Sequence, residues 1–179
     1  MRLERLKSLR DIPNDLLLVH EIYASIQGES SYAGLPCTFI RTTACHLRCT
    51  YCDTPQAFTQ GSPMSLEQIM GRVRELDLPL VELTGGEPLL QPLVLPLMQE
   101  LCDRGYTVLL ETSGALDLAA VDPRVVRIMD LKTPSSGEQD ANLFANVEVL
   151  KSHDEIKFVI GDRADYEWAK ELLQRLGLE

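Results

Sequence analysis

Three cysteines fall within a span of eight residues, in the pattern Cys45-x-x-x-Cys49-x-x-Cys52. Soft thiolate ligands select zinc, copper(I) or iron–sulfur clusters. A [4Fe–4S] cluster takes four ligands, so three close cysteines leave one iron open to an exogenous ligand. The other two cysteines do not complete the set, because Cys37 lies on the far side of a predicted strand and Cys102 lies inside a predicted helix. The motif therefore predicts a [4Fe–4S] site on Cys45, Cys49 and Cys52.

A structural zinc site is the alternative interpretation of the same cysteines. Zinc sites usually pair two short hooks of Cys or Cys and His, and the sequence has no second hook. His46 is either a further ligand or an ordinary loop residue. Metal analysis separates the two kinds of site, since zinc without sulfide identifies the structural one.

The whole chain has the composition of an ordinary globular protein. Its 179 residues predict a single domain spanning 1–179, with 45% hydrophobic and 25% charged residues. A formal net charge of -10 disfavours nucleic acid and anionic membranes as direct partners. No apolar run is long enough to span a bilayer, and the N-terminus carries Arg2, Glu4, Arg5 and Lys7 without a signal core. A cytoplasmic location is expected.

Short apolar strands alternate with helices along the chain. Strands are predicted at 19–25, 38–42, 80–83, 106–110, 125–129 and 155–160. After an amphipathic lead-in over 1–17, helices are predicted from Ser65 and at 91–104, 140–151 and 165–176. This order is typical of parallel βα units. Because a closed eight-unit barrel needs about 250 residues, we expect an α/β fold with a partial (β/α) barrel and a site at the carboxyl ends of its strands.

The cysteine pattern, with Tyr51 as its aromatic member, resembles the radical S-adenosylmethionine (SAM) superfamily. Gly85-Gly86-Glu87-Pro88 resembles the Gly-Gly-Glu-Pro motif of the same superfamily. The resemblance implies a partial barrel of the radical SAM type, in which the methionine group of SAM chelates the open iron. It also implies that Tyr51 packs near the adenine and that Gly85, Gly86 and Glu87 hold the amino group of SAM.

Two further strand ends carry polar motifs, Glu111-Thr112-Ser113-Gly114 and Asp130-Leu131-Lys132. By the same resemblance, Thr112, Ser113 and Lys132 contribute to ribose and carboxylate contacts with SAM. The alternative is that they are helix-capping loop residues.

A narrower resemblance is to the 7-carboxy-7-deazaguanine synthases. It rests on Glu21–Glu29, Phe39-Ile40-Arg41, Cys52-Asp53-Thr54, 83–88 and 132–137, and covers roughly residues 20–160. It implies a lyase of queuosine and deazapurine biosynthesis, which converts 6-carboxy-5,6,7,8-tetrahydropterin to 7-carboxy-7-deazaguanine with loss of ammonia. In such an enzyme an adenosyl radical does the chemistry, and Mg²⁺ binds at the position of Thr54.

The same resemblance assigns a substrate site. Gln27 and Glu29, with their neighbours Ile26 and Gly28, suit the donor–acceptor edge of a pterin, with Glu29 as an acceptor. Arg41 suits the substrate carboxylate, because its planar fork binds a carboxylate bidentately. Thr84 is expected to hydrogen-bond the substrate. The alternatives are turn residues, a surface ion pair and a strand-end cap.

The resemblance also implies a homodimer and an electron donor such as flavodoxin or ferredoxin. Relatives continue with a further strand and a basic, aromatic tail, so an abbreviated C-terminus is expected here, where the sequence ends at Glu179. A glycyl-radical-enzyme activase is the second enzyme hypothesis, since it shares both SAM motifs. Such an activase must bind a protein loop and has no use for a pterin edge.

Overall fold

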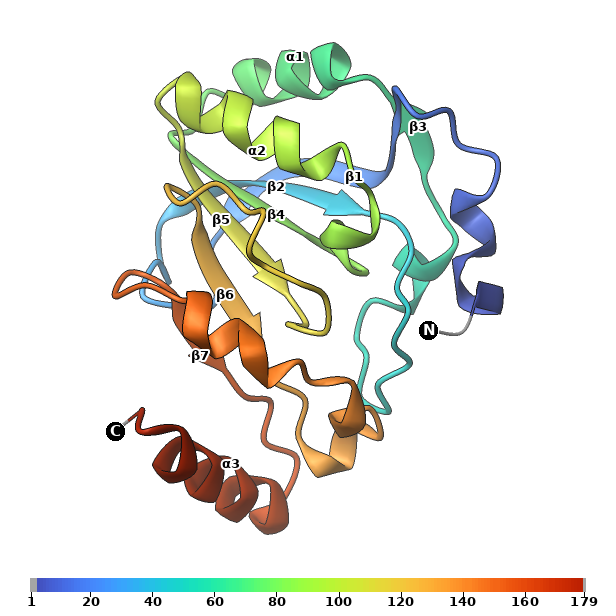
Figure 1. Ribbon diagram of the computed structural model, residues 1–179. Coiled ribbons are helices and arrows are strands. Elements are labelled where there is room, and N and C mark those ends of the chain that lie inside the picture. Colours follow the sequence, from blue (N-terminus) through green and yellow to red (C-terminus); the bar gives the residue numbers. More distant parts are fainter. Residues whose placement is uncertain (1–2, 179) are drawn as a thin grey trace.

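A computed structural model describes residues 3–178 as a single curved sheet flanked by helices (Figure 1). The seven strands run in the order β3-β1-β2-β4-β5-β6-β7. Their bounds are β1 Leu17–Ile26, β2 Pro36–Thr42, β3 Ser62–Met64, β4 Leu80–Gly85, β5 Thr107–Thr112, β6 Val126–Asp130 and β7 Glu155–Lys157. The α-helices are α1 Leu66–Leu76, α2 Val94–Asp103 and α3 Arg163–Leu176.

Five consecutive strands of the sheet, from β2 to β7 in the sheet order, are parallel to one another. β1 is antiparallel to both β2 and β3. The sheet does not close, because β3 and β7 form its two edges. The predicted partial barrel is therefore confirmed, and its parallel part brings the ends of β2, β4, β5 and β6 to one edge.

Alternating side chains along β4 divide the two faces of the sheet. Val81 and Leu83 join the main core, which α1 and α2 cover with buried residues such as Met70 and Leu97. Leu80 belongs to a smaller cluster on the opposite, concave face. Because side chains alternate along a strand, Glu82 and Thr84 point to the same face as Leu80. The concave face is therefore where polar side chains of the strands can meet.

Local sequence explains where α1 begins and ends. Ser65 accepts a hydrogen bond from the backbone N–H of Gln68, whose side chain accepts one from the backbone N–H of Ser65. Asp77 ends the helix in the left-handed conformation. These caps fix the helix that follows the cysteine loop and leads into β4.

The predicted helix over 140–151 is wrong. The segment forms two 3-10 helices, Gln139–Ala141 and Phe144–Val149, because two asparagine side chains bind loop backbone instead of solvent. Asn142 pairs with the N–H and C=O of Lys132, and Asn146 binds the carbonyls of Gly114 and Leu116.

Most other elements differ from the prediction in extent, and a few short ones were not predicted. The strand predicted at 155–160 ends at Lys157, and the three-residue β3 was not predicted. The lead-in is a 3-10 helix over Leu3–Leu9, and further 3-10 helices lie at Pro55–Phe58, Pro88–Leu90 and Pro134–Ser136. None of the helices in the described part of the chain is long and apolar enough to cross a membrane.

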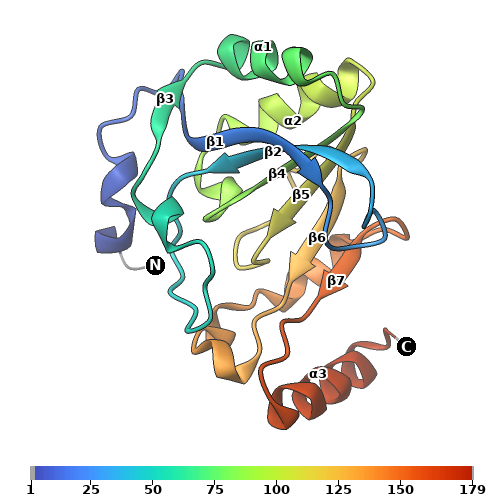
Figure 2. The same ribbon diagram turned by 180° about the vertical axis from the view of Figure 1, so that it is seen from behind.

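The loop between β1 and β2 reaches across the open side of the sheet to β7 (Figure 2). The N–H and hydroxyl of Ser31 both donate to Glu155, the hydroxyl at 2.6 Å. Glu29 in the same loop pairs with Lys157. Side chains, and not a backbone ladder, therefore connect the two sides of the half-barrel.

Candidate active site

A cavity of about 450 Å³ lies on the concave face of the sheet. It extends from the loops that follow β2, β4, β5 and β6 to the loop between β1 and β2, so it takes side chains from both ends of the half-barrel. Most residues assigned to a site from the sequence line it: Gln27, Gly28, Glu29, Arg41, Cys45, Cys49, Tyr51, Cys52, Thr54, Thr84, Gly85, Gly86, Thr112, Ser113 and Lys132. The sequence motifs thus meet around one space.

Two predicted residues lie outside this lining. Ile26 ends β1 with 58% of its surface exposed, and it does not contact the cavity. Glu87 is fully buried behind the cavity wall. The two other cysteines lie where the sequence predicts, Cys37 on β2 and Cys102 in α2, and neither lines the cavity.

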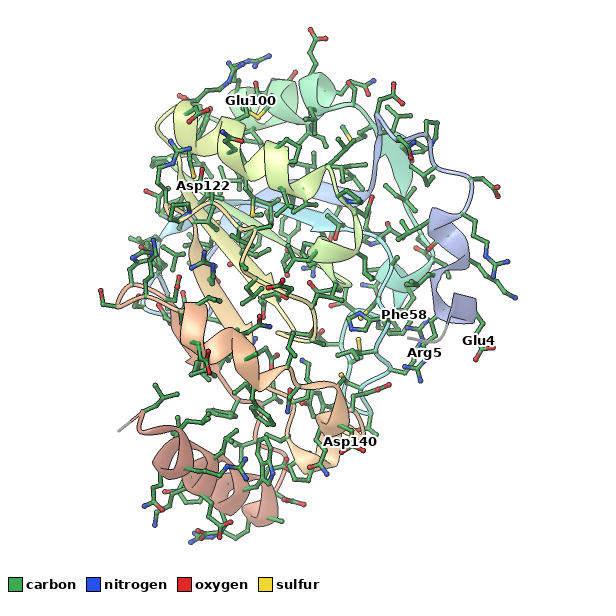
Figure 3. The ribbon with its side chains drawn as sticks, viewed as in Figure 1. Glu4, Arg5, Phe58, Glu100, Asp122 and Asp140 are labelled. Carbon is green, nitrogen blue, oxygen red and sulfur yellow. The ribbon has the colours of Figure 1, made fainter. Side chains whose placement is uncertain are left out.

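The cysteine loop has little regular structure of its own and is held by side chains from distant segments. Arg5 donates to the carbonyl of His46 at 2.7 Å and also pairs with Glu138. Glu138 in turn accepts from the backbone N–H of Arg48, whose guanidinium lies over the ring of Phe58. Figure 3 shows Arg5 and Phe58 at the same corner of the molecule. These contacts fix the loop that carries the three thiols.

The two glycines after β4 allow the cysteine loop to approach that strand closely. A Cβ at Gly86 would lie 2.0 Å from the carbonyl oxygen of Ala44 and 3.0 Å from the Cβ of Cys45. Gly85 has a φ of +139°, and a Cβ there would lie 2.3 Å from the carbonyl oxygen of Thr42. The motif therefore forms a cradle directly beside the first cysteine.

The three thiols suit a cluster better than a single ion. Within residues 3–178, no group of three or more His, Cys, Asp or Glu side chains is arranged to hold one metal ion. A [4Fe–4S] cube takes one thiolate on each of three irons, so its ligands need not converge on one point. Cys45, Cys49 and Cys52 line the same cavity from one loop, and this arrangement fits such a cube.

Burial shapes the chemistry of the first thiol. It raises the pKa of Cys45 to about 11, mainly because the buried environment disfavours the thiolate. A neutral thiol is a poor metal ligand. The ionised form at Cys45 therefore needs a cationic partner such as iron.

Glu87 anchors the loop after β5. One carboxylate oxygen accepts from the hydroxyl of Thr112 at 2.8 Å and from the N–H of Leu89 at 3.2 Å. The other accepts from the N–H and the hydroxyl of Ser113, at 2.9 and 2.5 Å. Both oxygens are thus bonded within the protein, and Thr112 and Ser113 extend from this anchor into the cavity lining.

Replacing Glu87 should therefore affect both stability and the loop that it holds. We expect Glu87→Ala to lower the free energy of unfolding by about 3 kcal/mol, because buried donors lose their acceptor. We also expect weaker SAM binding with the iron content intact. Urea unfolding and SAM titration of the reconstituted protein measure the two effects.

Glu75→Ala is the matched control, since Glu75 is exposed on α1 and, among residues 3–178, pairs only with Arg72 one turn away. It should change neither property measurably. If Glu87→Ala behaves like this control in both measurements, Glu87 does not hold the loop.

The substrate end of the cavity is a network of charged groups. Lys157 pairs with Glu29 and Glu111, and this positive charge lowers the pKa of Glu111 even though burial opposes the shift. Thr84 donates to Glu111 at 3.0 Å. Arg41 bonds Glu21 through Nε at 2.9 Å, while its Nη1 makes no hydrogen bond within the described residues.

Sequence reasoning missed two charged residues that line the cavity, Glu82 and Lys157. Glu82 is a carboxylate in the middle of an otherwise apolar strand. A charged residue at such a position could have indicated a functional role. Lys157 carries no motif and reaches the cavity only because β7 pairs with β6, opposite Asp130. Asp130 and Glu111 themselves belong to post-strand motifs that the sequence did single out.

Comparison with known proteins identifies the family. Residues 39–177 match the family model of the radical SAM superfamily. A 7-carboxy-7-deazaguanine synthase of Koribacter versatilis is 53% identical over 163 residues, which cover 90% of this chain and 72% of the relative. The chain belongs to the 7-carboxy-7-deazaguanine synthase family. A second member, from Thermoplasma acidophilum, is 38% identical and matches 90% of this chain and 78% of its own.

A solved structure of the family has the same fold. The crystal structure of QueE from Escherichia coli matches with a TM-score of 0.75 at 26% identity, over 89% of this chain and 78% of that one. The resemblance drawn from the sequence is thereby confirmed, together with the radical SAM fold. The [4Fe–4S] cluster and SAM follow as the cofactors of the superfamily, and magnesium as that of the synthases. Membership in this family supports neither of the two alternatives considered from the sequence, the structural zinc site and the glycyl-radical-enzyme activase.

Proposed function

We propose that this enzyme converts 6-carboxy-5,6,7,8-tetrahydropterin to 7-carboxy-7-deazaguanine with loss of ammonia, in queuosine and deazapurine biosynthesis. The observation that carries the proposal is one cavity lined at one end by the three cysteines and the Gly85-Gly86 cradle and at the other by Arg41, Thr84 and Glu111. The proposal also draws on the name shared by relatives up to 53% identical.

Roles for the cofactor end follow from chemistry and position. The cluster on Cys45, Cys49 and Cys52, with SAM bound, would supply the radical that starts the ring contraction. We assign Tyr51 to the adenine, the backbone of Gly85 and Gly86 to the amino group of SAM, and Thr112, Ser113 and Lys132 to its ribose and carboxylate.

In this proposal Glu87 does not contact SAM and instead holds Thr112 and Ser113 in place.

Lys132 is suited to bind an anionic group such as the SAM carboxylate. Its ammonium group remains charged because it lies 2.9 Å from the carboxylate of Asp130.

Roles for the substrate end follow in the same way. Arg41 would bind the substrate carboxylate through Nη1, which has no hydrogen-bond partner among the described residues. Thr84, whose hydroxyl proton goes to Glu111, would accept a hydrogen bond from the ring. Thr54, beside Asp53, offers hard oxygen atoms for Mg²⁺, which usually keeps few protein ligands and adds substrate oxygens. Buried residues of the cavity lining, such as Phe39, Glu82 and Thr84, would limit access of water to the reacting ring.

Anaerobic reconstitution followed by incubation with SAM, reductant and the carboxypterin tests the function. We expect formation of the deazaguanine, detected by mass, and stimulation by Mg²⁺. A pterin without the 6-carboxylate should be a poor substrate, because Arg41 and Mg²⁺ would both lose their oxygen partner. If the protein binds SAM on a complete cluster and still leaves the carboxypterin unchanged, the proposed reaction is wrong.

Further properties of the enzyme stay predictions. We propose that residues 1–179 form one radical SAM domain, that a flavodoxin or ferredoxin supplies the electron and that the enzyme is a homodimer. A cytoplasmic location is likewise a prediction. Sedimentation at micromolar concentration tests the dimer directly.

A further inference from the structure

The cavity contains a buried carboxylate whose bonding is incomplete. Glu82 lies in the middle of β4, lines the cavity and is 4% exposed. One of its oxygens accepts a hydrogen bond from Nε2 of Gln27, and the other accepts none from any described residue. Within the part of the chain that the structure describes, no cationic nitrogen lies within 4 Å of it, since Lys157 pairs with Glu29 and Glu111 instead. A buried carboxylate in this state needs further donors.

The surroundings of Glu82 also oppose its charge. Burial, with the negative charges of Glu111 and Glu29, raises the pKa of Glu82 to about 7, although Gln27 and Lys157 act in the opposite direction. At neutral pH, N–H donors of a ligand would therefore favour the ionised carboxylate. Such a ligand gains more here than at an exposed acid, because water competes less for the acceptor.

The neighbouring strand places Glu82 at a useful distance from Arg41. In the β2–β4 ladder, Phe39 is the partner of Glu82 and Arg41 is the partner of Thr84, and all four line the cavity. Two residues advance a strand by about 7 Å and neighbouring strands lie about 5 Å apart, so the Cα atoms of Arg41 and Glu82 are about 9 Å apart. A bicyclic ring with a carboxylate at one end and N–H groups at the other can bridge such a pair, with Phe39 beside its apolar surface.

We propose that Glu82 is a substrate-binding residue that accepts hydrogen bonds from the amino-pyrimidinone edge of the carboxypterin. This inference rests on the proposed function. Gln27 is then a positioning residue, because its amide is bonded at both ends, to Glu82 and to the N–H of Glu29 at 3.1 Å. The side chain of Glu29 is 56% exposed and already paired with Lys157, so Glu82 is the acceptor that determines specificity.

Two unreactive ligands separate this role from a structural one. 6-Carboxypterin carries the 2-amino group, and 6-carboxylumazine has an oxygen in its place. With the cluster and SAM bound, the parent protein should bind the pterin roughly ten- to a hundredfold more tightly than the lumazine, since an amino donor to a carboxylate is lost. Glu82→Gln keeps the shape of the side chain and an acceptor for Gln27. It should lose most of that discrimination while keeping its iron content and SAM affinity.

Glu100→Gln is the matched control, because Glu100 is on the outer surface of α2 and pairs with Arg104 (Figure 3). It should retain the full preference for the pterin. Glu82 does not recognise the amino group if Glu82→Gln keeps the parent's preference for the pterin, or if it lowers the affinity for both ligands equally. Either result leaves the proposed function unaffected. If the parent binds neither ligand nor turns over the carboxypterin, the proposed function and this inference both fail.

Discussion

Cys45→Ala, Cys49→Ala and Cys52→Ala are each expected to abolish the cluster. The parent protein should take up about four iron and four sulfide per chain on anaerobic reconstitution. Removing any one of three thiolates leaves two, and the remaining loop has no replacement within the cavity lining, where no other cysteine lies. Iron and sulfide analysis with the absorbance near 400 nm measures the loss, which should be close to complete.

Cys37→Ala and Cys102→Ala are the controls for that experiment. Cys37 is fully buried on β2, where burial raises its pKa to about 12 and keeps the thiol neutral. Cys102 lies in α2, on the other side of the sheet from the cavity. Both variants should retain a full cluster. Loss of iron in Cys102→Ala together with retention in Cys49→Ala would overturn the ligand assignment.

Arg41→Ala is expected to lose turnover of the carboxypterin while still binding SAM. Its guanidinium is the cation proposed for the substrate carboxylate, and truncating one partner of such a pair costs about 2–5 kcal/mol. The ratio kcat/KM should therefore fall roughly thirtyfold to a thousandfold or more. Steady-state kinetics under anaerobic conditions measures the loss, and a SAM titration verifies that the cofactor end is intact.

Two variants sharpen the Arg41 result. Arg41→Lys keeps the charge and loses the planar fork, so it should recover only part of the activity. Arg72→Ala removes an exposed guanidinium from α1 and should leave kcat/KM unchanged. A substrate without the 6-carboxylate should be almost indifferent to Arg41→Ala. Equal losses for both substrates would show that Arg41 supports the fold of the site and does not bind the carboxylate.

The cofactor end of the site was predictable because its residues lie close together in the sequence, in short motifs. The three cysteines lie in one loop, and Gly85 and Gly86 follow directly on a strand whose apolar run is visible in the sequence. The role of Glu87 was not predictable in the same way. The sequence shows a carboxylate beside two glycines, but only the structure shows that its oxygens are bonded to Thr112 and Ser113.

The substrate end depends on pairings between distant segments, which a single sequence does not reveal. Glu82 faces the cavity because of its parity in β4, and its partner Gln27 lies 55 residues earlier in the chain. Lys157 enters through the register of β7 against β6. The helix predicted over 140–151 failed for a related reason, since Asn142 and Asn146 bind loops that are remote in sequence.

The bridge between the β1–β2 loop and β7 affects the order in which the molecule assembles. Ser31 and Glu155 are separated by 124 positions in the chain, and Glu29 and Lys157 by 128. Closing a loop between such distant residues has a large entropic cost. The contacts offset that cost only after the intervening strands have formed. During synthesis on the ribosome, this wall of the cavity is completed only after β7 has emerged. In the finished protein, amide exchange near Ser31 should report the first opening, well before the central strands exchange.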